Sequence, residues 1–232
     1  RDFEKFFRKE YAAIVVEGFH SILLYEKIKS NLTYRKAILR IHNIEDEYHL
    51  YLSKWESNLI KKLFYFIESK KFKYFCKSYS FQNNFNSLVF ISSKDLQNLL
   101  FDNVKNKYHV PPLLDTAALS DPFQNRKNYI FYIGNLNLPD NRKAILEGYF
   151  ILKDLLKKYG FKLIVCGQCR NEKVLKKLMS DSNIICMFNV QNKELYENYI
   201  KSKVFFNYSK NPCGVKLKYI ESLSFGLPSL SN

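Results

Sequence analysis

The most informative stretch of the chain reads Tyr208-Ser-Lys-Asn-Pro-Cys-Gly214-Val-Lys-Leu-Lys-Tyr-Ile-Glu221-Ser-Leu-Ser-Phe-Gly226-Leu-Pro228. An apolar run over 204–208 leads into its Pro/Gly loop, which opens a helix with Lys216 and Lys218 in the first turn. Helix N-termini carry free backbone N–H groups and partial positive charge, so they bind phosphate. Lysines in a first turn oppose the helix dipole, and an anion bound there would explain them. The stretch therefore predicts a phosphate site.

The same stretch resembles the donor-site signature of the group 1 glycosyltransferases, which have the two-domain GT-B fold. In that family the loop-to-helix turn holds the diphosphate of a nucleotide-sugar donor, and a glutamate on the helix holds the donor ribose. The resemblance implies that Gly214, Val215 and Lys216 bind the diphosphate and that Glu221 binds the ribose. The usual family pattern has a second glutamate at the position that Cys213 occupies here. The Gly-Val-Lys-Leu-Lys form is similar to a subgroup variant of this signature.

Strands and helices alternate through the second half of the chain. An apolar run over 128–133 stops at Gly134, and the following helix, ended by Gly160, is expected to bury one face. That face contains Ala144, Gly148, Ile151, Leu152 and Leu155. Further strands are expected at 161–166, 183–188 and 204–208, with helices at 172–179 and 193–200. This alternation predicts a parallel sheet with right-handed crossovers.

The first half alternates less regularly, with strands expected at 12–16, 36–41 and 87–91 and a helix at 20–28. A long helical region after the second strand is expected to bury a stripe formed by Leu52, Trp55, Leu59, Leu63 and Phe66. The Pro-rich segment 107–127 reads as a linker. We therefore predict an α/β protein with two Rossmann-like domains, 1–106 and 128–232, facing a cleft and truncated at both ends.

A histidine and a glutamate follow a strand in Leu39-Arg-Ile-His42-Asn-Ile-Glu45. Ligands of parallel α/β sheets bind at the carboxyl ends of the strands, and a histidine there can act as a base near neutral pH. Arg-x-His-Asn-x-Glu resembles an element of some group 1 members, in which the histidine faces the acceptor and the donor sugar. By that resemblance His42 and Glu45 are catalytic. A structural histidine is the alternative, and Glu17 at another strand end could share the site.

The loop after Gly134 would be the first loop of the donor domain, with the glycine letting backbone approach a phosphate. Family members often place an Arg and a Lys in this loop to hold the diphosphate. Here Asn135 follows the glycine. By the resemblance, phosphate binding shifts to Lys216 and to Arg142 or Lys143.

The net charge of +15 favours anionic partners, although a compositionally biased, lysine-rich chain would show the same excess. The basic and aromatic helix from Trp55 to Lys77 could lie on an anionic membrane, bind nucleic acid, or be a solvated surface. No apolar run reaches the ~18 residues of a transmembrane helix. Five scattered cysteines suggest free thiols in a reducing compartment, and Cys166 and Cys169 read as buried cysteines.

The resemblance implies a retaining transferase that moves a sugar from a nucleotide-sugar donor to the hydroxyl of a glycan or lipid-linked acceptor, in cell-surface polysaccharide synthesis. No cofactor, metal or nucleic acid is expected, and the expected location is the cytoplasm, peripheral to the inner face of the membrane. The alternatives are another nucleotide-sugar enzyme of this fold, such as an epimerase or a glycogen synthase-like polymerase, or a catalytically silent binding subunit.

Overall fold

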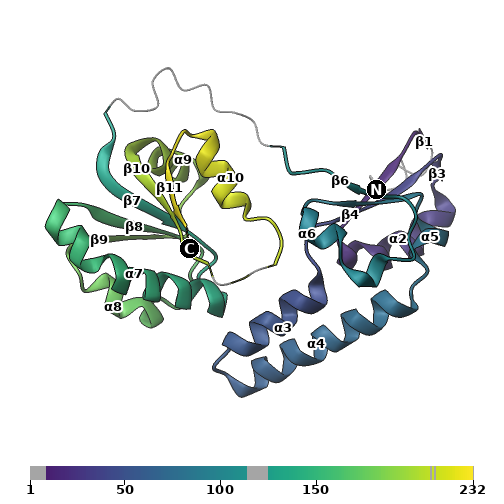
Figure 1. Ribbon diagram of the computed structural model, residues 1–232, viewed down its shortest axis with the longest axis horizontal. Coiled ribbons are helices and arrows are strands. Elements are labelled where there is room, and N and C mark those ends of the chain that lie inside the picture. The colour runs from purple at the N-terminus through teal and green to yellow at the C-terminus, as the bar shows by residue number, and fades with distance from the viewer. Residues whose placement is uncertain (1–8, 114–124, 210, 212, 232) are drawn as a thin grey trace. The chain divides into compact units, whose positions relative to one another are not determined.

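The computed structural model describes residues 9–113, 125–209, 211 and 213–231. The chain divides into two compact units, each built on its own parallel sheet (Figure 1). The first unit includes Leu59–Pro112 and Cys213–Val215 besides the residues up to Lys54, and the second includes Trp55–Asn58 and Lys216–Asn232 besides Leu113–Pro212.

The first unit contains a four-stranded sheet with the order β2-β4-β5-β6, in which all neighbours are parallel. A separate two-stranded pair, β1 with β3, was not predicted. The strands are β1 (Glu10–Tyr11), β2 (Ile14–Glu17), β3 (Thr33–Tyr34), β4 (Ala37–Ile41), β5 (Ser87–Phe90) and β6 (Lys107–His109). The helices are α2 (Ile22–Ile28), α3 (Glu45–Trp55), α4 (Leu59–Ser78), α5 (Phe81–Asn84) and α6 (Ser93–Leu96).

The core of the first unit is aromatic. Leu39 and Leu88 are fully buried on neighbouring strands, and Phe19, Phe81 and Phe101 pack against one another above them. The expected helix at 20–28 begins as a 3-10 turn and becomes α-helical at Ile22. Ser92 caps the helix after β5, because its hydroxyl accepts a hydrogen bond from the Asp95 amide.

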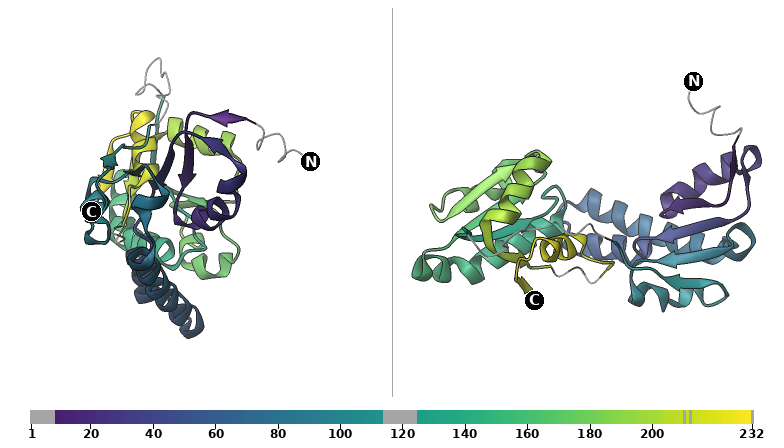
Figure 2. Two further views of the ribbon diagram at one scale, coloured as in Figure 1. Left: turned by 90° about the vertical axis from the view of Figure 1, so that its right-hand side faces the viewer. Right: turned by 90° about the horizontal axis from the view of Figure 1, so that it is seen from above.

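The long helical region is broken, and most of its predicted buried stripe is exposed. α3 ends at Trp55 and α4 begins at Leu59, with Glu56 accepting a hydrogen bond from the Asn58 amide between them. Of the predicted stripe, Leu52 is buried, whereas the exposed residues are Leu59, Leu63 and Phe66. The break changes the helical phase, so one continuous stripe cannot face the core. α3 and α4 project from the sheet of the first unit (Figure 1 and Figure 2).

The second unit contains a five-stranded parallel sheet with the order β11-β10-β7-β8-β9. From the central strand β7 the chain adds β8 and β9 on one side, and it then adds β10 and β11 on the other side. This is a Rossmann-type order, in which the direction of strand addition reverses between β7 and β10. The strands are β7 (Lys127–Ile133), β8 (Lys162–Gly167), β9 (Ile184–Phe188), β10 (Ser202–Asn207) and β11 (Ser229–Ser231). The helices are α7 (Pro139–Tyr159), α8 (Lys176–Met179), α9 (Asn192–Lys201) and α10 (Leu217–Ser224).

Helices cover both faces of this sheet (Figure 1). One core lies under α7 and α8, and the other lies under α9 and α10. Ala144, Gly148 and Leu152 face the first core as predicted, but Ile151 and Leu155 are exposed. The buried stripe of α7 runs instead through Ile145, Tyr149 and Leu156. Cys166 and Cys169 are buried free thiols, as predicted.

The predicted linker is too long at both ends. Lys107–His109 forms β6 and pairs with β5, and Lys127 already begins β7. The remainder of the predicted linker includes 114–124, which lies outside the described residues. Three residues of strand are too few to show the alternating pattern on which strand prediction depends.

Candidate functional site

A cavity of about 420 Å³ opens at the carboxyl ends of the central strands in the second unit. Open α/β sheets bind their ligands at this edge, outside the carboxyl ends of the strands. Glycine, amide and apolar side chains form most of its wall, and one lysine enters it. The lining residues are Ile133, Gly134, Asn135, Gly167, Gln168, Asn189, Val190, Asn192, Leu195 and Lys218.

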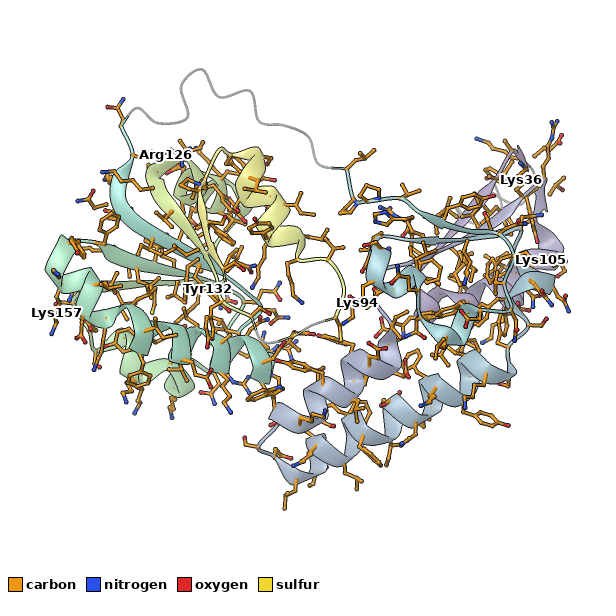
Figure 3. The ribbon with its side chains drawn as sticks, viewed as in Figure 1. Lys36, Lys94, Lys105, Arg126, Tyr132 and Lys157 are labelled. Carbon is orange, nitrogen blue, oxygen red and sulfur yellow. The ribbon has the colours of Figure 1, made fainter. Side chains whose placement is uncertain are left out.

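Lys218 is the cation of this cavity. Its ammonium donates a hydrogen bond to the carbonyl of Ile133 at 3.0 Å and lies 4.9 Å from the ring centre of Tyr132. Burial lowers the pKa of Lys218 to about 8, with a further reduction from the charge of Lys216 and a smaller opposing effect of Asp140. Tyr132 is labelled in the centre of the second unit in Figure 3. A lysine held against a strand-end carbonyl is suited to bind an anion in the cavity.

Two glycines allow the strand ends to approach each other at the cavity wall. The Gly134 amide donates to the carbonyl of Cys166 at 3.1 Å. A Cβ at Gly167 would lie 1.8 Å from the Gly134 oxygen, and Gly167 has a φ of 152°. Any side chain at Gly167 would therefore push the two loops apart. Gly134 lines the cavity, and its predicted contact with a phosphate stays a prediction.

Glu221 is held by a buried tyrosine. The hydroxyl of Tyr199 on α9 donates to Oε2 of Glu221 at 3.0 Å, and the Tyr199 ring stacks on Phe225. Lys218, one turn earlier on α10, bonds to the carbonyl of Ile133. α10 begins at Leu217, so Lys216 precedes its first turn as the capping residue.

The loop before α10 requires glycine at position 214. Gly214 has a φ of +63°, and a Cβ there would lie 1.9 Å from Oδ1 of Asn43. The segment Cys213–Val215 groups with the first unit, so this contact is internal to that unit. Cys213 is buried, and it supplies a thiol where the family pattern has a carboxylate.

The two other predicted phosphate ligands are engaged elsewhere. The Arg142 guanidinium donates to the carbonyls of Leu136 and Asn137, at 3.1 and 2.7 Å, and so holds the β7–α7 loop together. The Lys143 ammonium lies 4.0 Å from the ring centre of Trp55. Neither residue lines the cavity. Lys218 is the lysine that lines it.

In the first unit, Glu17 binds His42 at the carboxyl ends of β2 and β4. Nε2 of His42 lies 2.6 Å from Oε2 of Glu17, and Nη1 of Arg40 lies 3.4 Å from Oε1. The parallel register of β2 and β4 sets Glu17 beside Arg40, which places His42 next to the same carboxylate. The side chain of His42 is 47% exposed, so it is available to a ligand.

Glu45, the second predicted catalytic residue, is mostly buried at the start of α3. Burial raises the pKa of its carboxyl, although the charges of His20, His49 and His42 act in the opposite direction. Nδ1 of His49 lies 3.6 Å from Oε2 of Glu45 and 2.8 Å from its carbonyl oxygen. A buried carboxylate among three histidines is suited to holding that cluster in place.

A larger hollow, of about 500 Å³, lies at the opposite end of the first unit's sheet. Its walls are rich in amides, but those amides serve the backbone, as when Asn86 accepts a hydrogen bond from the Ala37 amide. In the described parts of the chain, no cluster of three or more His, Cys, Asp and Glu side chains is arranged to hold a metal ion. The cavity beside Lys218 is therefore the better candidate for a ligand site.

Sequence reasoning missed two features of the site. Lys218 was noticed only as a charge on the helix, and its depth in the cavity depends on the packing of α10. The Tyr199–Glu221 hydrogen bond joins residues on two different helices, so no local sequence pattern predicts it. The cleft predicted between the two domains stays a prediction.

No protein-family model matches the chain. A 44.6 kDa protein of the cps region of Klebsiella pneumoniae is 29% identical over 223 residues, covering 93% of this chain and 55% of that protein. Among solved structures, TarM superposes with a TM-score of 0.64 and 15% identity, over 94% of this chain and 40% of TarM.

The pneumococcal O-GlcNAc transferase GtfA, crystallised with UDP and GlcNAc, superposes with a TM-score of 0.55 and 12% identity, over 94% of this chain and 41% of GtfA. The chain thus spans between 40% and 55% of the length of these three proteins. Both structural similarities cover nearly the whole chain, with a parallel sheet in each unit. The chain has the GT-B fold of glycosyltransferases.

Proposed function

We propose that the protein is a retaining glycosyltransferase that uses a nucleotide-sugar donor. The observation that carries this proposal is the cavity at the strand ends of the second unit, with Lys218 inside it. Its volume falls in the range of small-molecule sites. A cation at the carboxyl ends of parallel strands favours an anionic nucleotide.

The donor groups would be divided between Lys218 in this cavity and the residues of the turn that leads into α10. The amides of Gly214 and Val215, with Lys216 and Lys218, would hold the diphosphate, and the carboxylate of Glu221 would accept hydrogen bonds from the ribose. Tyr199 uses one oxygen of that carboxylate, which leaves the other for the ribose. In the reaction, the acceptor oxygen bonds to the anomeric carbon, the bond to the diphosphate breaks, and the cations stabilise the departing charge.

The first unit would supply the acceptor side. His42 would take the proton of the attacking hydroxyl, and Glu17 would fix the orientation of the imidazole. Glu45 would act through the histidine cluster, because most of its side chain is buried. The acceptor is proposed to be a glycan or a lipid-linked sugar in polysaccharide synthesis, which fits the cps-region relative.

A thermal-shift screen of UDP, GDP and CMP and their sugars tests the donor site. A nucleotide at a hundred times its Kd should add about 2.7 kcal/mol to the free energy of unfolding. Lys216→Ala, Lys218→Ala and Glu221→Gln should each weaken the binding of the active nucleotide, while Lys36→Ala, an exposed change in the first unit, should not. Unchanged binding by all three site variants would show that the site is wrongly assigned.

A second candidate is a catalytically silent nucleotide-binding subunit. It is favoured by Cys213, because a buried thiol cannot replace the charge of the glutamate that is usual in the family. The two functions differ in turnover. Release of nucleoside diphosphate from the donor, with or without an acceptor, supports the enzyme, whereas binding without any release supports the silent subunit.

A further inference from the structure

The outer face of α4 carries a cluster of exposed apolar side chains, which we call the α4 surface. It occupies the first half of the helix, where six large apolar residues fall within nine positions. They are between 43% and 81% exposed. Its members are Leu59, Ile60, Leu63, Phe64, Phe66 and Ile67.

These residues share one side of the helix. A helix turns about 100° per residue, so Leu59, Leu63, Phe66 and Ile67 fall within about 100° of one another. The opposite side holds the buried Ser69 and Cys76, and it packs Phe72 and Phe75 against the core of the first unit. The α4 surface therefore faces away from the sheet that the helix covers.

Lysines continue the outer face along the second half of the helix. α4 contains six lysines and one acidic residue, Glu68, which is paired with Lys71 at 2.7 Å. Lys70, Lys73 and Lys77 follow the apolar cluster at helical spacing, and all three are exposed. The Lys70 ammonium also lies 5.2 Å from the ring centre of Phe66. Apolar and cationic groups thus share one surface without a balancing negative charge.

The other long helix is less suited to the same partner. α7 also exposes apolar side chains, including Phe150, Ile151 and Leu155. However, it carries three acidic residues, Asp140, Glu147 and Asp154. An anionic partner is therefore favoured at α4.

We propose that the α4 surface docks on an anionic lipid bilayer, with its apolar side chains in the interface and its lysines at the headgroups. Interfacial helices combine apolar and lysine-rich groups in this way. Among the described residues no helix has the length and apolarity that a membrane span requires. The proposal does not depend on the proposed sugar transfer, since docking needs no nucleotide.

Flotation with two kinds of vesicle tests the proposal. One contains phosphatidylcholine alone, and the other contains roughly one-third phosphatidylglycerol, because each basic residue near an anionic surface adds affinity. The protein should float with the anionic vesicles at moderate salt and bind at least about tenfold less to the neutral ones. Equal binding to both, or to neither, would overturn the proposal.

Variants locate the contact. Leu63→Ser and Phe66→Ser should each lower the partition onto anionic vesicles about tenfold or more. The triple change Lys70→Gln, Lys73→Gln and Lys77→Gln should lower it roughly a hundredfold, at about fivefold for each lysine. Because all five side chains are exposed, thermal melting should confirm that these variants remain folded.

A matched control removes three exposed lysines elsewhere in the first unit: Lys9→Gln, Lys36→Gln and Lys105→Gln. Figure 3 shows that Lys36 and Lys105 lie away from the first half of α4. The control should bind nearly as tightly as the parent; a loss equal to that of the α4 lysines would overturn the assignment to this surface. Light scattering should detect no dimer that depends on Leu63. A dimer that Leu63→Ser disrupts would identify a second copy of the chain, in place of a bilayer, as the partner of the α4 surface.

Discussion

Lys218 lies in a cavity yet carries a charge, and the Ile133 carbonyl is the group that makes this possible. Moving a charge from water into protein is costly unless it is hydrogen-bonded. One carbonyl at 3.0 Å compensates only in part, so the pKa of Lys218 falls to about 8. At neutral pH the group is still mostly protonated, and a bound diphosphate would stabilise that form further.

Nucleotide affinity should therefore decline as the pH rises through 8. The folded pKa of Lys218 lies below its ordinary 10.5, so the free protein loses this charge at about pH 8. With UDP or the nucleotide found in the screen, the Kd should increase about tenfold or more between pH 7 and 9.5. Titration calorimetry at several pH values measures it.

Lys218→Arg is the matched control, because a guanidinium stays protonated throughout this range. Its affinity should be nearly independent of pH. If the parent and this variant show the same profile, another group is responsible and the role of Lys218 is disproved.

Glu17 should act on turnover only through His42. Glu17→Gln keeps the size of the side chain but removes the charge 2.6 Å from Nε2, so turnover should fall about tenfold with little change in the KM for the donor. His42→Ala should lower turnover about a hundredfold. In the His42→Ala background, Glu17→Gln should have no further effect. Additive losses in the double variant would mean that Glu17 has a separate role.

Sequence reasoning could place His42 and Glu221 at strand ends and helix starts, because a strand's end and a glycine loop are local features. It could not tell that Arg142 would be used by loop carbonyls, since that depends on how the β7–α7 turn closes. The role of Lys218 depends likewise on the distance between α10 and the end of β7. Local patterns thus indicate where a residue lies along its strand or helix, but not which groups it bonds to.

At the level of helices and strands, the parallel sheet of the second unit was predicted well. Each of its strands except β11 is an apolar run bounded by turns, the pattern expected of strands buried on both faces. The long helical region of the first unit was predicted poorly, because Glu56–Asn58 breaks it and shifts the phase of every later residue. The Ser57-Asn58 pair is a helix-start signal that could have revealed the break.

The contact of α7 with β10 depends on a glycine. A Cβ at Gly148 would lie 2.4 Å from Cε1 of Phe206, whose ring is buried. Gly148→Ala gains up to ~1 kcal/mol in helix propensity but overpacks the core at a cost of ~1–3 kcal/mol. The variant should therefore be less stable by about 1 kcal/mol in urea unfolding.

Phe206→Leu should be less harmful in the Gly148→Ala background than alone, because the smaller side chain makes room for the new methyl group. Simple addition of the two losses would show that the clash relaxes in another way.

For the whole molecule, the core of the first unit shares no residue with the two cores of the second. Binding of UDP, or of the nucleotide found in the screen, should therefore protect one unit more than the other. Amide hydrogen exchange should slow in the cavity loops of the second unit and at the start of α10. The sheet of the first unit should exchange at nearly its free rate. Equal slowing in the two sheets would contradict a donor site built on the cavity of the second unit and the turn before α10.

The separate cores also bear on how such a protein can be inherited and engineered. Because the cores of the two units share no residue, a mutation that repacks one core requires no compensating change in the other. A chimera that joins this first unit to the second unit of a distant homologue should keep both cores intact. Selection could then exchange one core while conserving the other, and a laboratory could do the same if Cys213–Val215 stay with the first unit and Trp55–Asn58 with the second.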